Sequence, residues 1–195
     1  MRRARLPGPA RGLAIGLMGG SFNPAHEGHL HVAETALKRL RLDAVWWIVA
    51  RGNPLKSEHG SYADRLASAQ DFANRPRMYV SDIETALGLT YSADTIAALQ
   101  AAAPSARFVW IMGADNLRNF HQWKDWEGIA ARLPLAVIAR PGARISKTSP
   151  FARKFASARI READAPALAR SPAPAWVYLR ARESAASSTA LRAAS

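Results

Sequence analysis

Short apolar runs alternate with segments of helical periodicity along most of the chain. Strands are predicted where apolar, β-branched or aromatic residues run together and stop at a turn, over 13–18, 44–50, 77–81, 107–112, 135–139 and 176–179. Helices are predicted where apolar residues recur at helical spacing, over 30–40, 63–74, 93–102 and 125–133. Strands that are apolar throughout and alternate with helices are typical of a parallel sheet buried on both faces.

This order of elements predicts an α/β fold, a Rossmann-like doubly wound parallel sheet, in a single domain over residues 13–195. The preceding segment, 1–12, is Arg-rich and interrupted by prolines, and it is expected to be a loose basic arm. Residues 141–174 have no clear period, so no structure is predicted there. Right-handed crossovers place ligands at the carboxyl ends of the strands, and the segments that follow strands are therefore the places to look for chemistry.

The formal net charge of +12 suggests nucleic-acid binding, because basic surfaces bind phosphate backbones. The basic residues are scattered from Arg2 to Arg192, which favours a surface that attracts polyphosphates; a basic nucleic-acid-binding protein stays open as the alternative. The chain has no Cys, which excludes disulfides and Cys-ligated metals and fits a reducing compartment. No apolar run approaches the roughly 20 residues that span a bilayer. A cytoplasmic protein without membrane contact is therefore expected.

The segment between the first predicted strand and the first predicted helix carries the strongest chemical signal. It reads GGSFNPAHEGHL, and its two glycines, Gly19 and Gly20, let the backbone approach a ligand closely. The start of the following helix offers N–H groups with a partial positive charge, to which phosphate binds readily. His26 and His29 lie three residues apart, so both can donate hydrogen bonds to phosphate oxygens at that point.

Two common motifs do not account for this segment. It is neither G-x-G-x-x-G nor a P-loop, because it lacks the Gly-Lys-Ser/Thr ending, and as a glycine-rich turn alone it is weak evidence. The zinc motif H-E-x-x-H places its histidines four residues apart, whereas His26 and His29 are three apart and no third ligand is evident. No metal ligands are therefore predicted.

Taken whole, residues 19–29 resemble the signature G-G-[ST]-F-D-P-x-H-x-G-H of the nucleotidyltransferase superfamily. Only Asn23 departs, where Asp is common; Asn keeps a turn-stabilising hydrogen bond but not the charge. The resemblance implies that His26 and His29 are catalytic, binding the ATP phosphates and stabilising the charge that develops during adenylyl transfer. It also implies ATP contacts from Gly19, Gly20, Ser21 and Phe22.

A second match lies near the end of the chain. Residues 187–192, SSTALR, resemble the superfamily's S-S-T-x-[IL]-R element, in which hydroxyls cap a helix and the Arg faces the phosphates. By this resemblance Arg192 is a third catalytic residue, and ATP binding extends to Ser187, Ser188 and Thr189. Without the first motif, a capped terminal helix or a Ser/Ala tail would be the plainer interpretation. Only 193–195 follow this Arg, fewer residues than family members usually have.

Between these elements the resemblance narrows to the bacterial nicotinate mononucleotide adenylyltransferases. The matching segments are [TS]-Y-[ST]-x-x-T at 90–95, G-x-D-x-[LF] at 113–117, a Trp at 123 and R-P-G at 140–142. The resemblance implies that backbone N–H groups near Thr90 and Tyr91 receive the nicotinate carboxylate, while the Trp123 ring stacks on the pyridine.

Four further residues take roles from the same resemblance, each with a plainer alternative. Gly113 and Asp115 are assigned to the ATP site, although Asp115 alone is also a reasonable helix N-cap. Lys56 and Arg140 are candidates for binding the acceptor phosphate, and their alternative is solvated surface charge.

The implied enzyme is a nicotinate-nucleotide adenylyltransferase of NAD biosynthesis. The acceptor phosphate would attack the α-phosphorus of ATP in line, releasing pyrophosphate without a covalent intermediate. Its implied partners are ATP and nicotinate mononucleotide, and Mg²⁺ is expected to arrive with ATP because no carboxylate cluster resembles a metal cage. Phosphopantetheine and nicotinamide mononucleotide stay open as alternative acceptors.

Overall fold

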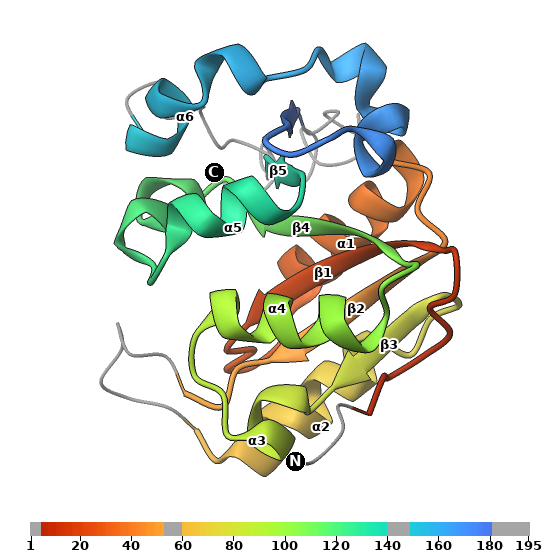
Figure 1. Ribbon diagram of the computed structural model, residues 1–195. Helices are drawn as coiled ribbons and strands as arrows, with labels where there is room; N and C mark the ends of the chain where they lie inside the picture. The colour runs from red at the N-terminus through yellow and green to blue at the C-terminus, as the bar shows by residue number, and fades with distance from the viewer. Residues whose placement is uncertain (1–4, 53–59, 140–148, 181–195) are drawn as a thin grey trace, which may run out of the picture.

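The computed structural model describes residues 5–52, 60–139 and 149–180. Within these ranges six strands form one parallel sheet in the order β3-β2-β1-β4-β5-β6 (Figure 1). The strands are β1 Ala14–Gly20, β2 Ala44–Val49, β3 Met78–Ser81, β4 Arg107–Gly113, β5 Leu135–Ile138 and β6 Trp176–Leu179. They lie where the apolar runs predict them, and the Rossmann-like doubly wound sheet is confirmed.

Helices connect the strands, and the four predicted ones are present with small changes at their ends. The α-helices are α1 Glu27–Arg39, α2 Tyr62–Phe72, α3 Ile83–Leu87, α4 Ser92–Ala102, α5 Trp126–Arg132 and α6 Pro150–Lys154. The 3₁₀-helices are η1 Asn116–Arg118, η2 Phe120–Gln122, η3 Ala156–Ala158 and η4 Glu162–Arg170. Among the described residues, no helix is long and apolar enough to cross a membrane.

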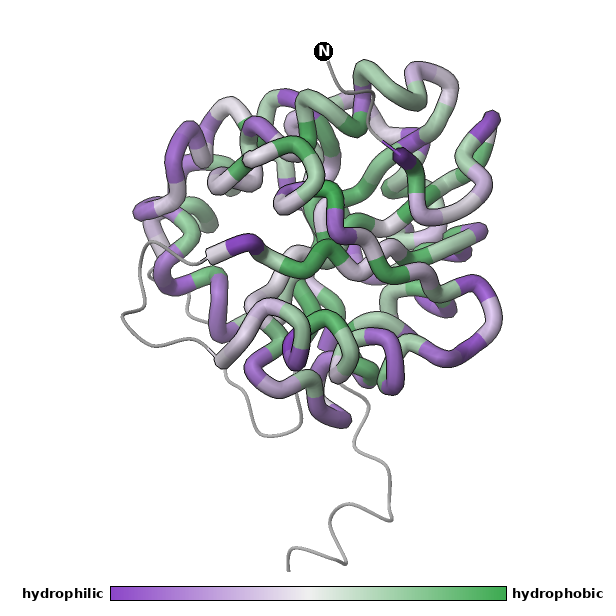
Figure 2. The backbone as a smooth tube through the Cα atoms, turned by 90° about the horizontal axis from the view of Figure 1, so that it is seen from below, coloured by the Kyte–Doolittle hydropathy of each residue, from purple (hydrophilic) through white to green (hydrophobic). Residues whose placement is uncertain are grey.

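Both faces of the sheet are buried, because successive side chains of a strand point to opposite sides. In β2, Val45 and Trp47 belong to the core formed with α1 and α2. Trp46 and Ile48 belong to the core formed with α4, α5 and α6. Figure 1 shows α1 behind the sheet and α4 in front of it, and Figure 2 shows hydrophobic segments inside and hydrophilic ones at the outer turns.

The direction of the connections reverses between β1 and β4, the two central strands. β1 pairs with β4 only over Ala14–Leu17, opposite Arg107–Trp110, although both strands continue to Gly20 and Gly113. In doubly wound sheets ligands bind at the carboxyl ends of the strands, where the order reverses. The fold therefore directs attention to the segments that follow these two strands.

The described part of the predicted N-terminal arm packs against the domain. Ala10 is buried and belongs, with the partly buried Leu6, to the core on the α4 side. A Cβ atom on Gly8 would lie 2.8 Å from the Tyr79 ring, so the backbone passes directly over that side chain. Within the segment expected to be a loose arm, residues 6–10 therefore make packing contacts with the rest of the chain.

Candidate active site

Gly19 and Gly20, the last two residues of β1, lie against two aromatic rings that leave no room for side chains at these positions. A Cβ atom on Gly19 would lie 2.7 Å from the Trp110 indole, and one on Gly20 would lie 2.9 Å from the Phe22 ring. The glycines were predicted from the need to approach a ligand. In the structure they are also required because these rings fill the positions that their side chains would occupy.

His26 and His29 form a reciprocal cap at the start of α1. The Nδ1 of His26 accepts a hydrogen bond from the Gly28 N–H at 3.1 Å, and the Nδ1 of His29 accepts one from the His26 N–H at 3.3 Å. The two rings lie against each other with centroids 3.9 Å apart. A neutral imidazole whose Nδ1 accepts a hydrogen bond carries its proton on Nε2. Both histidines are therefore set to donate through Nε2 at the N-terminus of a helix.

The Phe22 side chain is a core residue that supports His29. Its ring is 1% exposed, stacks with Trp47 at 5.1 Å and meets the His29 ring edge-on at the same centroid distance. Its backbone φ of 48° is in the left-handed region, which turns the ring inward. The ATP contact of Phe22 stays a prediction, and the burial of the ring leaves only the backbone for that contact.

Residues of α2 and of the segment before it hold the loop that leads to His26. The Asn23 Oδ1 accepts a hydrogen bond from the Gly60 N–H at 3.3 Å, a role that uses a carbonyl-type oxygen and needs no charge. The Ser68 Oγ accepts one from the Ala25 N–H at 3.0 Å. The Arg65 guanidinium donates to the Ser21 carbonyl at 2.9 Å. Asn23 thus holds this loop through an oxygen that an Asp side chain would also offer.

The segment at 90–91 and Trp123 lie close together, as the acceptor-site prediction requires. Lys124, the neighbour of Trp123, has its ammonium nitrogen 4.5 Å from the centroid of the Tyr91 ring and 3.3 Å from the Asp94 carboxylate. Tyr91 is 39% exposed and stands at the N-cap of α4. The N-terminus of α4 therefore lies near the segment that carries the partly buried Trp123 indole.

Trp123 also connects this segment to the loop after β1. Its ring lies edge-on to Trp110 at 6.1 Å and to Phe120 at 5.4 Å. Because Trp110 touches Gly19, one row of aromatic contacts runs from the predicted ATP loop to the predicted acceptor segment.

A buried carboxylate, Glu84, lies between the residues that follow β2 and the first turn of α4. Its Oε1 is 2.9 Å from the Thr95 hydroxyl, and its Oε2 accepts a hydrogen bond from the Arg51 N–H at 3.2 Å. Burial raises the pKa of Glu84 to about 7, and these two hydrogen bonds reduce the shift only in part. Glu84 therefore links the end of β2 to α4 and carries a proton below neutral pH.

The remaining predicted residues fall into two groups. Gly113 ends β4, and Asp115 stands at the N-cap position of η1 with αR backbone angles and no side-chain capping hydrogen bond, so its assignment to the ATP site stays a prediction. The others lie outside the described residues: Lys56, Arg140, Ser187, Ser188, Thr189 and Arg192. In the described ranges no group of three or more His, Asp or Glu side chains could hold a metal ion.

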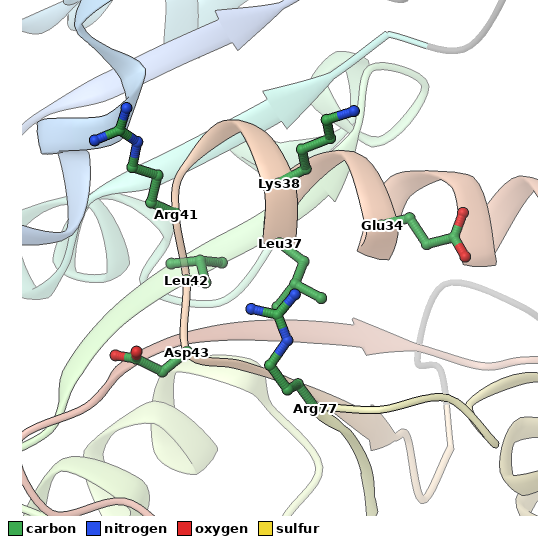
Figure 3. A pocket seen from close by; sticks show the side chains of 7 residues that line it. All are labelled: Glu34, Leu37, Lys38, Arg41, Leu42, Asp43 and Arg77. Carbon is green, nitrogen blue, oxygen red and sulfur yellow. The ribbon is translucent and has the colours of Figure 1, made fainter.

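A surface hollow of about 500 Å³ lies at the amino ends of the strands, opposite the edge of the sheet that carries the candidate site (Figure 3). It is lined from the last turn of α1 and from the residues just before β2 and β3, including Lys38, Arg41, Asp43 and Arg77. Figure 3 shows Lys38 and Arg41 pointing away from each other. Because this hollow lies at the amino ends of the strands, it is separate from the site described above.

Sequence reasoning missed four residues that shape the site: Arg65, Ser68, Glu84 and Lys124. A charged residue in a helical segment is ordinarily exposed, so nothing in the sequence marks Arg65 or Glu84 as buried. Lys124 had one available signal, its position next to the predicted ring-stacking Trp123.

The sequence comparisons agree with the geometry. Residues 17–194 match the model of the cytidylyltransferase-like family. A protein of Rhizobium meliloti (strain 1021), named "Probable nicotinate-nucleotide adenylyltransferase", is 50% identical over 93% of this chain and 98% of its own. One of Methylorubrum extorquens (strain PA1), with the same name, is 54% identical over 92% of this chain and 99% of its own.

Solved structures share the fold at much lower identity. The nicotinic acid mononucleotide adenylyltransferase of Plasmodium falciparum, complexed with NaAD, superposes with a TM-score of 0.69 at 17% identity, covering 89% of this chain and 77% of that one. A putative nicotinate-nucleotide adenylyltransferase from Vibrio parahaemolyticus gives a TM-score of 0.58 at 22% identity, covering 72% and 80%. These structures show the shared fold, and the family model and the sequence relatives show that the chain belongs to the nicotinate-nucleotide adenylyltransferases, within the cytidylyltransferase-like family.

Proposed function

We propose that this protein transfers the adenylyl group of ATP to nicotinate mononucleotide, giving nicotinate adenine dinucleotide and pyrophosphate. The relatives that match over nearly their whole length carry this activity in their names. The observation that carries the proposal is the reciprocal cap of His26 and His29, because it sets two Nε2–H donors at a helix N-terminus beside the point where strand order reverses.

The reaction needs no covalent chemistry from the protein. The acceptor phosphate attacks the α-phosphorus of ATP in line, the new P–O bond forms, and the bond to the departing pyrophosphate breaks. The Nε2–H groups of His26 and His29 and the N-terminus of α1 stabilise the charge that builds up on the phosphate oxygens. We assign Arg192, Ser187, Ser188 and Thr189 to the same phosphates on the strength of their motif.

Mg²⁺ belongs to the ATP substrate in this proposal. The phosphate oxygens of ATP supply ligands of the kind that Mg²⁺ prefers, and the ion keeps several waters. The substrates ATP and nicotinate mononucleotide fit a cytoplasmic enzyme, which we also propose.

The acceptor side is assigned to Trp123 and to the residues at the start of α4. The first N–H groups of a helix have no partner within it, and they favour a carboxylate. Thr90 and Tyr91 lead directly into that N-terminus, and the indole of Trp123 offers a flat face for the pyridine ring. We assign the phosphate of the acceptor to Lys56 and Arg140.

The experiment is product analysis with purified protein, MgATP and one acceptor at a time. We expect nicotinate mononucleotide to yield the dinucleotide and one equivalent of pyrophosphate, and phosphopantetheine to yield neither. Pyrophosphate release with phosphopantetheine but not with nicotinate mononucleotide would contradict the acceptor assignment. A salt-sensitive shift on mixed oligonucleotides without any pyrophosphate release would instead favour the nucleic-acid-binding alternative.

A further inference from the structure

Arg65, on the first turn of α2, is buried inside the carboxyl edge of the sheet. The residue is 3% exposed, and its guanidinium donates four hydrogen bonds, all to backbone carbonyls. Nη1 donates to the Ser21 carbonyl at 2.9 Å and to the Ala50 carbonyl at 2.7 Å. Nη2 donates to the Arg51 carbonyl at 3.2 Å, and Nε donates to the Gly60 carbonyl at 3.3 Å.

A buried guanidinium is costly, and here no carboxylate among the described residues forms an ion pair with it. Its charge is met by carbonyl dipoles and by the face of the Tyr62 ring, whose centroid lies 5.3 Å from the Arg65 Cζ, so its burial depends mainly on the four hydrogen bonds. The planar fork of Arg can reach several acceptors at fixed angles at once, which the single ammonium of Lys cannot do. The geometry of the carbonyls, rather than the charge alone, therefore requires Arg at this position.

The Gly60 carbonyl lies just before α2, and the other three carbonyls come from two segments that serve different halves of the proposed reaction. Ser21 begins the loop that leads to His26 and His29. Ala50 and Arg51 follow β2, and Arg51 is in turn bonded to the Glu84 carboxylate and to the Gly88 carbonyl, next to the predicted acceptor segment. One side chain thus joins the loop after β1 to the segment after β2.

We propose that Arg65 is a positioning residue that sets the placement of the ATP loop relative to the acceptor segment, without touching either substrate. This inference rests on the proposed function. In-line transfer requires the attacking oxygen about 3–3.5 Å from phosphorus, and a misplacement of about 1 Å can cost about 10²-fold in rate. We therefore expect the loss of this link to affect kcat and the binding of ligands that span both halves of the site more than the binding of either substrate alone.

The test compares Arg65→Lys and Arg65→Gln with the wild type, using kcat and the Kd values of three ligands. The ligands are a non-hydrolysable ATP analogue, nicotinate mononucleotide, and nicotinate adenine dinucleotide, which spans both halves. In Arg65→Lys we expect kcat to fall about 10²-fold and the dinucleotide Kd to rise at least about tenfold, with single-ligand Kd values within about threefold. The lysine keeps the charge and the aliphatic stem, so this variant decides the question if Arg65→Gln does not fold.

Arg75→Lys is the matched control, because Arg75 lies exposed just after α2 and its side chain, among the described residues, donates a hydrogen bond only to the neighbouring Asn74 carbonyl. It should leave all four quantities unchanged. A folded Arg65→Lys with wild-type kcat, or with ATP affinity lost as fully as dinucleotide affinity, would overturn the inference. A wild-type protein that forms no dinucleotide would overturn the proposed function and this inference with it, so the two failures are distinguishable.

Discussion

At the scale of single residues, His26 and His29 are oriented by two backbone hydrogen bonds and by the aromatic rings beneath them. The backbone bonds occupy Nδ1 on both rings, and Phe22 and Trp47 fill the space behind His29. A donor held in place before the substrate arrives needs no reorganisation when charge develops. Under the proposed mechanism the histidines are fixed donors, and losing either is expected to affect catalysis more than folding.

We expect His29→Ala to lower kcat/KM about 10²–10³-fold, the usual loss for one such donor. The variant should keep its fold, because the first N–H groups of α1 can bind water instead. The measurement is steady-state pyrophosphate release together with thermal unfolding. His31→Ala on the same helix is the matched control and should keep near-normal turnover. Near-normal turnover in His29→Ala itself would return His29 to a purely structural role.

Trp123→Ala should weaken the binding of nicotinate mononucleotide and its amide to the same degree, because stacking depends on the pyridine ring, which both share, and not on its substituent. A loss of about 0.5–1.5 kcal/mol corresponds to roughly a two- to tenfold rise in Kd. The control is Trp126→Ala, since Trp126 contacts Phe151 and Phe155 at the core instead. That variant should lower the unfolding temperature while leaving both Kd values unchanged. Loss of binding for only one mononucleotide would contradict the stacking role.

Glu84 makes the stability of the protein depend on pH. Its pKa is raised from 4.5 to about 7 in the folded state, so the folded protein binds more protons than the unfolded chain between those values. Stability from this group is therefore full below about pH 4.5 and is lost as the pH rises through 7, by on the order of 3 kcal/mol.

Glu84→Gln should remove this dependence. The amide can donate to the Thr95 hydroxyl while its oxygen accepts from the Arg51 N–H, so it imitates the protonated acid. The unfolding free energy of the variant minus that of the wild type should increase from pH 5 to pH 8 in denaturant titrations. A difference that stays constant over that range would show that Glu84 is already ionised at pH 5.

At the scale of elements, the long apolar strands and amphipathic helices were predictable because a parallel sheet imposes continuous hydrophobic runs. α3 was not predicted, since the five residues of Ile83–Leu87 are too few to show a period. The segment 150–170 was not predicted either, because it consists of the short α6 and two 3₁₀-helices, one containing Pro166. Burial of Arg65 and Glu84 depends on carbonyls and N–H groups supplied by distant elements, which local patterns do not encode.

The C-terminal element offers a prediction of its own. If Ser188, Thr189 and Arg192 bind the ATP phosphates, deleting 187–195 should raise the KM for ATP and lower kcat/KM at least about tenfold. The hydrophobic cores are built from residues up to Leu179, so the unfolding temperature should scarcely change. Unchanged kinetics after this deletion would reduce the motif at 187–192 to coincidence.

At the scale of the whole molecule, the strand order brings the ends of β2, β1 and β4 to one edge of the sheet. In the chain, the cap of α1 follows β1, the start of α4 comes after β3 and α3, and Trp123 comes after β4. The contacts through Trp110, Arg65 and Glu84 join these segments. Under the proposed function, this arrangement supplies one segment for each substrate and a fixed link between them.

The central claim is transfer to nicotinate mononucleotide, and it is tested most directly by comparing kcat/KM for this acid and for its amide at saturating MgATP. If N–H groups near Thr90 and Tyr91 receive the carboxylate, the acid forms charge-assisted hydrogen bonds, whereas the amide leaves donors unpaired at about 1–3 kcal/mol each. We predict at least about a tenfold preference for the acid, and about 10³-fold if two donors take part. Equal kcat/KM for the two mononucleotides would contradict the nicotinate assignment.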